Sequence, residues 1–126
     1  MRNSINIMVF SVLLGLPGAL SAAKDDVAQT EIEHLLIFVS DSPCTFIRNK
    51  VRHEGPAASE HLRLKYEGDQ RHVQSAELFI ERVGTKSSLT GNPYTVNCGG
   101  EAETSREWLH RELATYRNLS DPYRDR

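Results

Sequence analysis

The side chains with the most potential for chemistry lie in a glycine-rich segment, GTKSSLTGNPYTVNCGG, which begins at Gly84 and contains Lys86, Ser87, Ser88 and Cys98. A Walker-type phosphate loop needs a glycine, four residues and then Gly-Lys-Ser or Gly-Lys-Thr, placed between a strand and a helix. Here a threonine separates Gly84 from Lys86, and no glycine occupies the required upstream position. The segment therefore does not indicate a nucleotide site.

Serine chemistry is the second possibility for this segment. A nucleophile elbow has the pattern Gly-x-Ser-x-Gly, but Gly84 to Ser87 is one residue too long and a leucine stands where the second glycine should be. A distant histidine such as His61 can still act as base in the folded chain, so a small hydrolase using His61 with Ser87 or Ser88 stays open as an alternative. The plainer interpretation is a turn at residues 90–93, with the serines bonding to the backbone.

Two Glu-x-x-His pairs, Glu31 with His34 and Glu107 with His110, have the spacing found in the di-iron sites of some four-helix bundles. At about 100° per residue, His34 points away from the apolar face of its predicted helix, and Glu107 lies nearly opposite the face that carries Trp108. Metal ligands in a bundle core must point inward. We therefore expect both pairs to be exposed to solvent and predict neither a metal nor another cofactor.

The amino-terminal residues 1–23 have the three parts of a secretory signal peptide: Arg2, an apolar run from Ile5 to Leu16, and a small-residue stretch that ends at Ala23. The apolar run is interrupted by serine, glycine and proline before it reaches the roughly 20 residues that a membrane span requires. The sequence predicts cleavage near Ala23, a periplasmic or secreted protein, and no membrane span in the mature chain.

The mature chain would carry 17 acidic and 14 basic residues, a net charge of −3 with neutral histidines, because only Arg2 leaves with the leader. With no basic run to follow a phosphate backbone, we do not expect a nucleic acid partner. The two cysteines, Cys44 and Cys98, predict one disulfide in an oxidising compartment, since there is no Cys-x-x-Cys pair. We expect one compact domain over residues 24–117 and a frayed tail over 118–126.

The elements that must position these side chains follow from the apolar periodicity. A capping box of Thr104 with Glu107 starts the last helix, and Ser75 caps the third. Alternating side chains predict a hairpin with its turn at Asn49 and a strand from Tyr94 to Cys98 beside it. Four helices are expected, from Asp25 or Asp26 to near Ser40, from Pro56 to near Gly68, from Ser75 to Gly84, and from Thr104 past Tyr116. The predicted fold class is α+β, mainly α, with about four short helices, a small antiparallel β element and one disulfide.

Three groups of residues carry a resemblance to a known family. They are Cys44 with Phe46-x-Arg48-Asn49, His61-Leu62 with Lys65-Tyr66, and Ser87-Ser88-x-x-Gly91-x-x-Tyr94 before Cys98. Their spacing resembles domain-of-unknown-function family 5329, a family of small exported proteobacterial proteins. The resemblance covers nearly all of the mature chain. It implies an envelope location and a shared fold, and it supplies no mechanism.

Polar side chains that a structural loop would not need are expected to meet beside the disulfide. Our hypothesis is a cleft in which Arg48 and Lys65 receive an anionic group of a peptide, glycan or envelope protein. The competing interpretation is a buried hydrogen-bond network that only fixes the loops, and the sequence does not favour the cleft over it. The leading function is a binding or scaffold protein of the envelope. An inhibitor that inserts residues 88–94 into a hydrolase is the second, and the oligomeric state is left open. The candidate cleft consists of Arg48, Asn49, His61, Lys65, Ser87, Ser88 and Tyr94.

Overall fold

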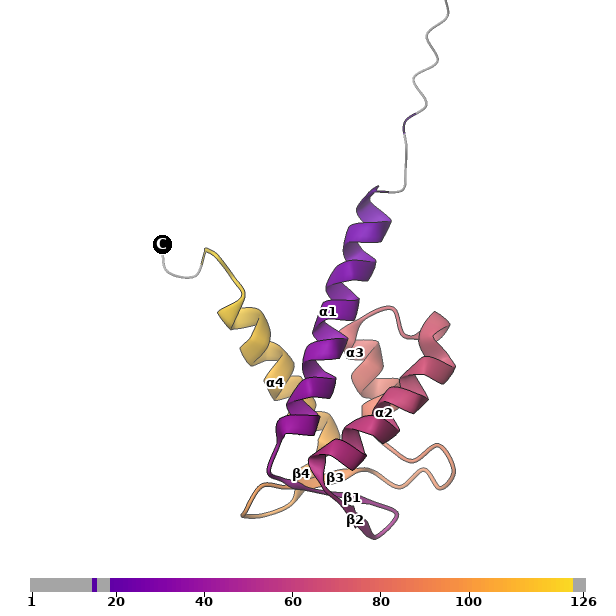
Figure 1. Cartoon of the computed structure of the whole chain (residues 1–126), viewed down its shortest axis with the longest axis vertical. Helices are drawn as coiled ribbons and strands as arrows, with labels where there is room; N and C mark the ends of the chain where they lie inside the picture. The colour runs from indigo at the N-terminus through magenta and orange to yellow at the C-terminus, as the bar shows by residue number, and fades with distance from the viewer. Residues whose placement is uncertain (1–14, 16–18, 124–126) are drawn as a thin grey trace, which may run out of the picture.

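The structure is a computed structural model that describes residue 15 and residues 19–123 (Figure 1). Over these residues the chain forms four α-helices, a four-stranded antiparallel sheet and one disulfide, so the predicted fold class is confirmed. Most of the predicted leader lies outside the described residues. Within the described part of the chain, no helix is long and apolar enough to cross a membrane.

Helix α1 (Ala19–Asp41) supplies one wall of the core. Its apolar residues Ile32, Leu35, Leu36 and Val39 are almost completely buried, as their spacing predicts. The helix ends one residue after the predicted position but begins at Ala19, several residues before the expected cap. Nothing between Ala19 and the expected cap breaks a helix, and alanine favours one.

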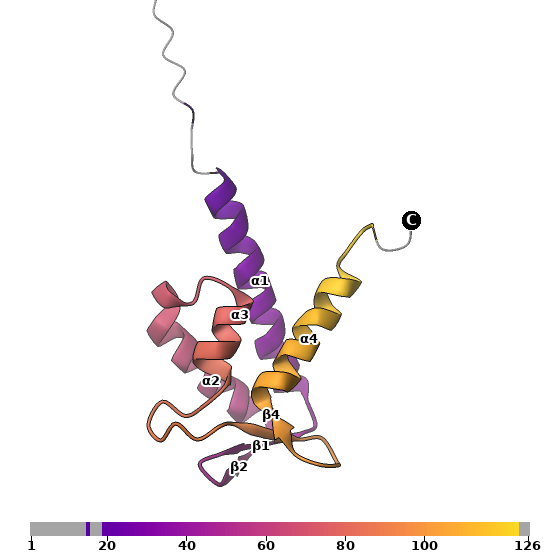
Figure 2. The same cartoon turned by 180° about the vertical axis from the view of Figure 1, so that it is seen from behind.

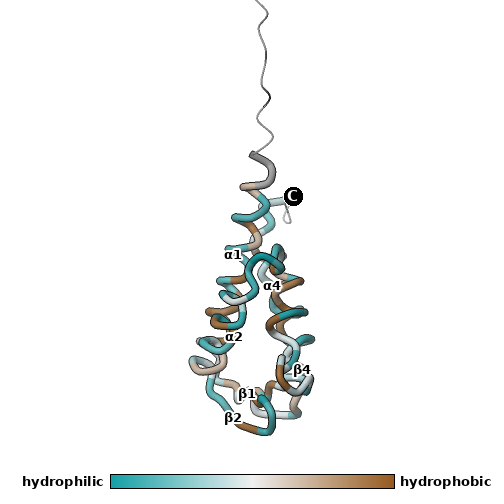
Figure 3. The backbone as a smooth tube through the Cα atoms, turned by 90° about the vertical axis from the view of Figure 1, so that its right-hand side faces the viewer, coloured by the Kyte–Doolittle hydropathy of each residue, from teal (hydrophilic) through white to brown (hydrophobic). Residues whose placement is uncertain are grey.

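The sheet lies across one end of the helices, while α1 begins and α4 ends at the other end (Figure 2). Strands β1 (Thr45–Arg48), β2 (Val51–His53), β3 (Thr95–Asn97) and β4 (Glu103–Thr104) pair in the order β2-β1-β3-β4. Seen from the side, the helices stand on this sheet (Figure 3).

The predicted hairpin is formed by β1 and β2, with Asn49 and Lys50 at its turn. Both turn residues have a positive φ, 50° and 67°, which is the backbone geometry of the tight turn that favours Asn-Gly. Lys50 therefore adopts this conformation without glycine. On the other side of β1, Phe46 pairs with Val96 of β3, and the disulfide joins Cys44 to Cys98 at the same end. The predicted strand pairing and disulfide are confirmed.

Helix α2 (Gly55–Asp69) starts where the chain passes close to the end of α1. A Cβ on Gly55 would lie 2.5 Å from the carbonyl oxygen of Val39 and 2.8 Å from those of Ser40 and Ser42. Only glycine allows this approach. The helix passes Gly68 by one residue and ends in a short 3-10 turn, Gln70–His72.

The third predicted helix is divided between α3 (Ala76–Phe79) and a π-helical turn, η2 (Ile80–Gly84). Ser75 caps it as predicted, because its side chain accepts a hydrogen bond from the Leu78 amide at 3.1 Å. Helix α4 (Ser105–Leu119) begins at the predicted capping box, where the Thr104 hydroxyl accepts from the Glu107 amide at 3.2 Å. Both helices add apolar residues to the core, among them Phe79, Ile80, Val83, Trp108, Leu109 and Leu113.

The predicted exposure of Glu31 and His34 was wrong. Glu31 is only 8% exposed, and Arg117 of α4 donates to its two carboxylate oxygens at 2.7 and 2.8 Å. His34 contacts Glu112 at 2.8 Å and stacks on the ring of Tyr116. The helical projection correctly turned His34 away from the apolar face of α1, but α4 covers that side of the helix. Among the described residues, no three His, Cys, Asp or Glu side chains are grouped as metal ligands would be.

Candidate functional site

The seven residues of the predicted cleft come together in the fold. Arg48 ends β1, Asn49 forms the hairpin turn, His61 and Lys65 lie one turn apart on α2, and Tyr94 precedes β3. With Ser87 and Ser88 of the neighbouring loop, they line a cleft of about 350 Å³, which we call the basic cleft. The fold thus confirms that these residues are neighbours, while their binding role stays a prediction.

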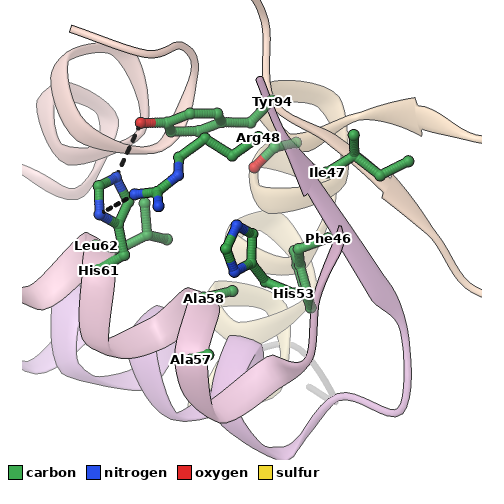
Figure 4. Close-up of a pocket in the computed structure, with 10 residues that line it drawn as sticks. Phe46, Ile47, Arg48, His53, Ala57, Ala58, His61, Leu62 and Tyr94 are labelled. Atoms are coloured by element: carbon green, nitrogen blue, oxygen red, sulfur yellow. Dashed lines mark hydrogen bonds between the residues drawn. The ribbon is translucent and has the colours of Figure 1, made fainter. Parts of the chain in front are cut away.

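A smaller cavity of about 50 Å³ adjoins the basic cleft, and we call it the inner pocket (Figure 4). Arg48, His61 and Tyr94 line both spaces and so form the boundary between them. Beyond this boundary the inner pocket is mostly apolar. Its other lining residues are Phe46, Ile47, His53, Ala57, Ala58, Leu62 and Ser105.

The boundary residues are linked through the ring of His61 (Figure 4). A guanidinium nitrogen of Arg48 contacts His61 Nδ1, and His61 Nε2 lies 3.2 Å from the hydroxyl of Tyr94. Because arginine can only donate, Nδ1 is the acceptor, so a neutral ring carries its hydrogen on Nε2 and donates to Tyr94. Burial, followed by the charges of Arg48 and Lys65, lowers the pKa of His61. These effects favour the neutral ring.

Lys65 uses its three ammonium hydrogens within the protein. Its Nζ donates to the carbonyl oxygens of Val83 at 3.0 Å and Lys86 at 2.9 Å, and to the Tyr94 hydroxyl at 3.2 Å. Burial first, and then the charge of Arg48, lowers the pKa of this amine. Lys65 therefore holds the loop after α3 in place, and its contribution to an anion would come from its charge rather than from a free donor.

Asn49 and Ser87 connect the hairpin turn to the loop. The amide of Asn49 donates to Ser87 Oγ at 3.2 Å and its carbonyl accepts from the Thr90 hydroxyl at 2.6 Å. Ser87, only 5% exposed, also accepts from the backbone amides of Leu89 and Thr90. These contacts support the interpretation of Ser87 as a structural turn residue that bonds to the backbone. Ser88, in contrast, is exposed at the rim of the cleft.

The ring nitrogens of His61 contact Arg48 and Tyr94, and Ser87 Oγ contacts Asn49 and its own loop. In this arrangement His61 is not placed to take a proton from Ser87, and the carboxylates of the described residues form no hydrogen bond with His61. The geometry thus offers no support to the proposed Ser–His pairing. The cleft contains donors and positive charge rather than an assembled nucleophile.

The linings of the basic cleft and inner pocket contain no aspartate or glutamate among the described residues. Of the other described arginines, five are paired with carboxylates, as in Arg63 with Glu33 and Arg111 with Glu103, and the two without an ion pair, Arg52 and Arg71, are exposed. Arg48 is half-buried, and in the part of the chain that the structure describes it forms no ion pair. An unneutralised, half-buried guanidinium in a net acidic protein is unusual and is suited to an anionic ligand.

The comparison with protein families gives a clear assignment. Residues 26–117 match a family of unknown function, DUF5329. The chain belongs to this family. It is also 34% identical over 86 residues to an uncharacterized protein, YfeK, of Salmonella typhimurium strain LT2, an alignment that covers 68% of this chain and 71% of the relative. No solved structure matches the chain significantly. The DUF5329 match includes every residue of the basic cleft and the inner pocket.

Sequence reasoning missed the inner pocket and its residue His53. This histidine is partly buried on β2, and its Nε2 atom is fully buried with no hydrogen-bond partner among the described residues. The available signal was the pair Ala57-Ala58 early in α2, because small side chains leave space where a helix faces a sheet. Finding the pocket also required the packing of α2 against β1, which periodicity does not give.

Proposed function

We propose that this chain is an exported binding protein of the cell envelope whose basic cleft receives an anionic group of its ligand. The observation that carries the proposal is Arg48. It lies between two neighbouring cavities, makes one hydrogen bond, to His61, and has no carboxylate partner among the described residues. A guanidinium has five N–H donors, so four remain for a ligand.

A purely structural role explains Arg48 less well than it explains Lys65. The three hydrogens of Lys65 all meet acceptors in the protein, whereas Arg48 places its charge near a second cation and a histidine. Burying like charges together costs stability unless an opposite charge is supplied. An incoming anion supplies it, and charge-assisted hydrogen bonds to a guanidinium are among the strongest in proteins.

Export is supported by the leader pattern of residues 1–23 and by the disulfide, which is typical of oxidising compartments. The mature unit would be the domain of residues 24–117 with the tail of 118–126. Intact mass measurement without reductant, on protein from its own host, tests this. We expect the mass of a chain that begins near residue 24, less the two hydrogens lost when the disulfide forms. The mass of an uncleaved, reduced chain would contradict export.

The anion proposal is tested by thermal unfolding in sodium acetate or phosphate against sodium chloride at equal ionic strength. Wild-type protein should be stabilised by the anion in proportion to the logarithm of its concentration once the site is filled. Arg48→Met should abolish this response. Arg52→Met is the matched control, because Arg52 is an exposed arginine in the same hairpin and does not line the cleft. Equal responses in all three proteins would reject the site.

A second function, inhibition of an envelope or host hydrolase, is favoured by Leu89. This side chain is 94% exposed on a loop fixed by hydrogen bonds from the Gly91 amide to the Ser87 carbonyl and from the Tyr94 amide to the Thr85 carbonyl. A rigid loop loses little entropy when it binds. Lysozyme and protease assays with excess protein test this function, with Leu89→Asp as the variant that should lose inhibition. Unslowed hydrolysis across the panel would reject it.

A further inference from the structure

We infer that the end of the molecule formed by the hairpin turn and the loop of residues 85–93 docks on an anionic phospholipid surface, with a head-group phosphate in the basic cleft. This inference rests on the proposed function and names the ligand of that site. Three observations carry it: the distribution of charge along the chain, two exposed apolar side chains at the mouth of the cleft, and the unused donors of Arg48.

The basic residues of this end are separated from the acidic residues of the chain. Residues 45–53 and 84–100 together contain four basic residues and no aspartate or glutamate. The four are Arg48, Lys50, Arg52 and Lys86. The rest of the mature chain then has ten basic and 17 acidic residues. An anionic surface attracts one end of such a protein and repels the remainder, so it orients a chain that is acidic as a whole.

The hairpin turn and the loop of residues 85–93 lie on the same side of the sheet end of the molecule (Figures 1 and 2). Asn49 in the turn fixes one to the other, because its amide donates to Ser87 of the loop at 3.2 Å. Two acidic residues follow the basic segments in the chain, and both lie away from this edge. Glu54 stands at the end of β2 opposite the turn, and Glu101 is in the loop between β3 and β4, on the other side of the sheet.

Two exposed apolar side chains stand at the mouth of the basic cleft. Val51 and Leu89 both line it and are 56% and 94% exposed. Val51 pairs with Arg48 across the hairpin, so the two side chains lie on the same face of the sheet. Apolar side chains beside cations match a phospholipid surface, where the apolar groups enter the boundary of the acyl chains and the cations stay at the level of the head groups.

Arg48 supplies the contact to the head group. Its guanidinium uses one of five N–H hydrogens in the bond to His61, and the four that remain suit the several acceptor oxygens of a phosphate. Lys65 adds the attraction of its charge, since its own hydrogens are engaged within the protein. A free phosphate would use Arg48 and leave Val51 and Leu89 in water. The apolar mouth of the cleft is therefore the observation that favours a lipid.

The test is co-sedimentation of the full mature protein with vesicles of phosphatidylcholine alone, or of equal parts of phosphatidylcholine and phosphatidylglycerol. Binding is expected only to the vesicles with phosphatidylglycerol, and it should weaken several-fold when the salt concentration rises from about 0.02 M to about 0.15 M, because salt screens the attraction.

Two variants test the residues that the inference uses. Leu89→Asp should weaken binding about tenfold, because it removes an apolar contact and adds a negative charge. Leu119→Asp is the matched control and should bind as wild type does, since Leu119 is 78% exposed at the end of α4, far from the sheet. Arg48→Met should weaken binding about fivefold, the effect of one basic residue near an anionic surface. Circular dichroism checks that each variant is folded.

The outcomes separate this inference from the proposed function. Equal sedimentation with both kinds of vesicle, or undiminished binding of Leu89→Asp, would overturn the inference. Glycerol 3-phosphate that raises the unfolding midpoint of wild type but not of Arg48→Met, with no sedimentation on either vesicle, would assign the cleft to free phosphates. That result would overturn the inference and leave the anion site standing. Binding that needs Leu89 but is unchanged in Arg48→Met would support the docking surface and reject the proposed role of the cleft.

Discussion

The two sides of this domain use positive charge in different ways. Where α4 meets α1 and α3, Arg117 is enclosed by Glu31 and Glu77 and makes hydrogen bonds to both. These two carboxylates raise the pKa of its guanidinium. In the basic cleft, the guanidinium of Arg48 has one hydrogen bond among the described residues, to the ring of His61, and lies near a second cation, Lys65. Within the described chain, the charge of Arg117 is therefore neutralised by two carboxylates, whereas the charge of Arg48 has no carboxylate beside it.

This difference separates side chains that hold the fold from those available to a ligand. A guanidinium paired with a buried carboxylate is difficult to remove, because removal leaves an unpaired charge out of water. A guanidinium without a carboxylate can be removed at little cost, or even with a gain when a like charge is nearby. Mutations on the two sides should therefore have opposite consequences for stability and for binding.

The largest effect is expected from the disulfide, which ties the strands that carry the cleft to each other. It closes a loop with a sequence separation of 54, and the loop-entropy model gives about 4 kcal/mol for a loop of this size. Cys44→Ala with Cys98→Ala should lower the free energy of unfolding by about this amount in urea denaturation. An unchanged midpoint in the double variant, or in wild type with reductant, would contradict this role.

The next effect concerns the contact between α2, which carries His61 and Lys65, and the end of α1. Gly55→Ala places a methyl group against backbone carbonyls that cannot move freely, so it should destabilise by about 1–3 kcal/mol. Gly68→Ala is the matched control in the same helix, with open space at its Cβ, and should stabilise by about 0.5–1 kcal/mol. Equal effects of the two changes would show that the close approach at Gly55 is unimportant.

The central comparison predicts a difference between Arg117→Met and Arg48→Met. Arg117 is 44% exposed and its partner Glu31 is buried, so its loss should cost about 1–2 kcal/mol, between the values for surface and buried pairs. Arg48→Met should change the free energy of unfolding by less than about 0.5 kcal/mol, because the loss of its hydrogen bond to His61 is offset by the relief of its repulsion from Lys65. If Arg48→Met is the more destabilising variant, the cleft is a structural network.

The smallest effect is a pH dependence from His61. Its pKa is below the ordinary 6.5 because of burial and nearby cations, so the unfolded chain binds more protons than the folded one as pH falls through this region. Stability should therefore fall on acidification from pH 7 to 5.5. His61→Gln should show a shallower slope, measured by urea denaturation at each pH. Arginine partners lower the pKa values of carboxylates such as Glu33 and Glu77. These carboxylates therefore change the pH dependence of stability only near and below pH 4.5. An equal slope in both proteins would contradict the assignment.

The sequence predicts the elements of this fold better than their contacts. Helix starts at Ser75 and Thr104 were predictable because capping depends on residues three positions apart. The disulfide, together with its flanking strands, was enough to bring Arg48 and Tyr94 together. Helix contacts were not predictable in the same way: Glu31 and His34 face α4 because of how α1 and α4 meet, and the inner pocket depends on the depth at which α2 packs on β1. Both are properties of packing between distant segments.

The most direct test of this account is urea denaturation of wild type and Arg48→Met, each with sodium acetate and with sodium chloride at equal ionic strength. The account predicts nearly equal stability in chloride and an acetate-dependent increase in wild type alone. An Arg48→Met protein that is markedly less stable in chloride, or that gains as much from acetate as wild type, would contradict the claim that this arginine serves a ligand rather than the fold.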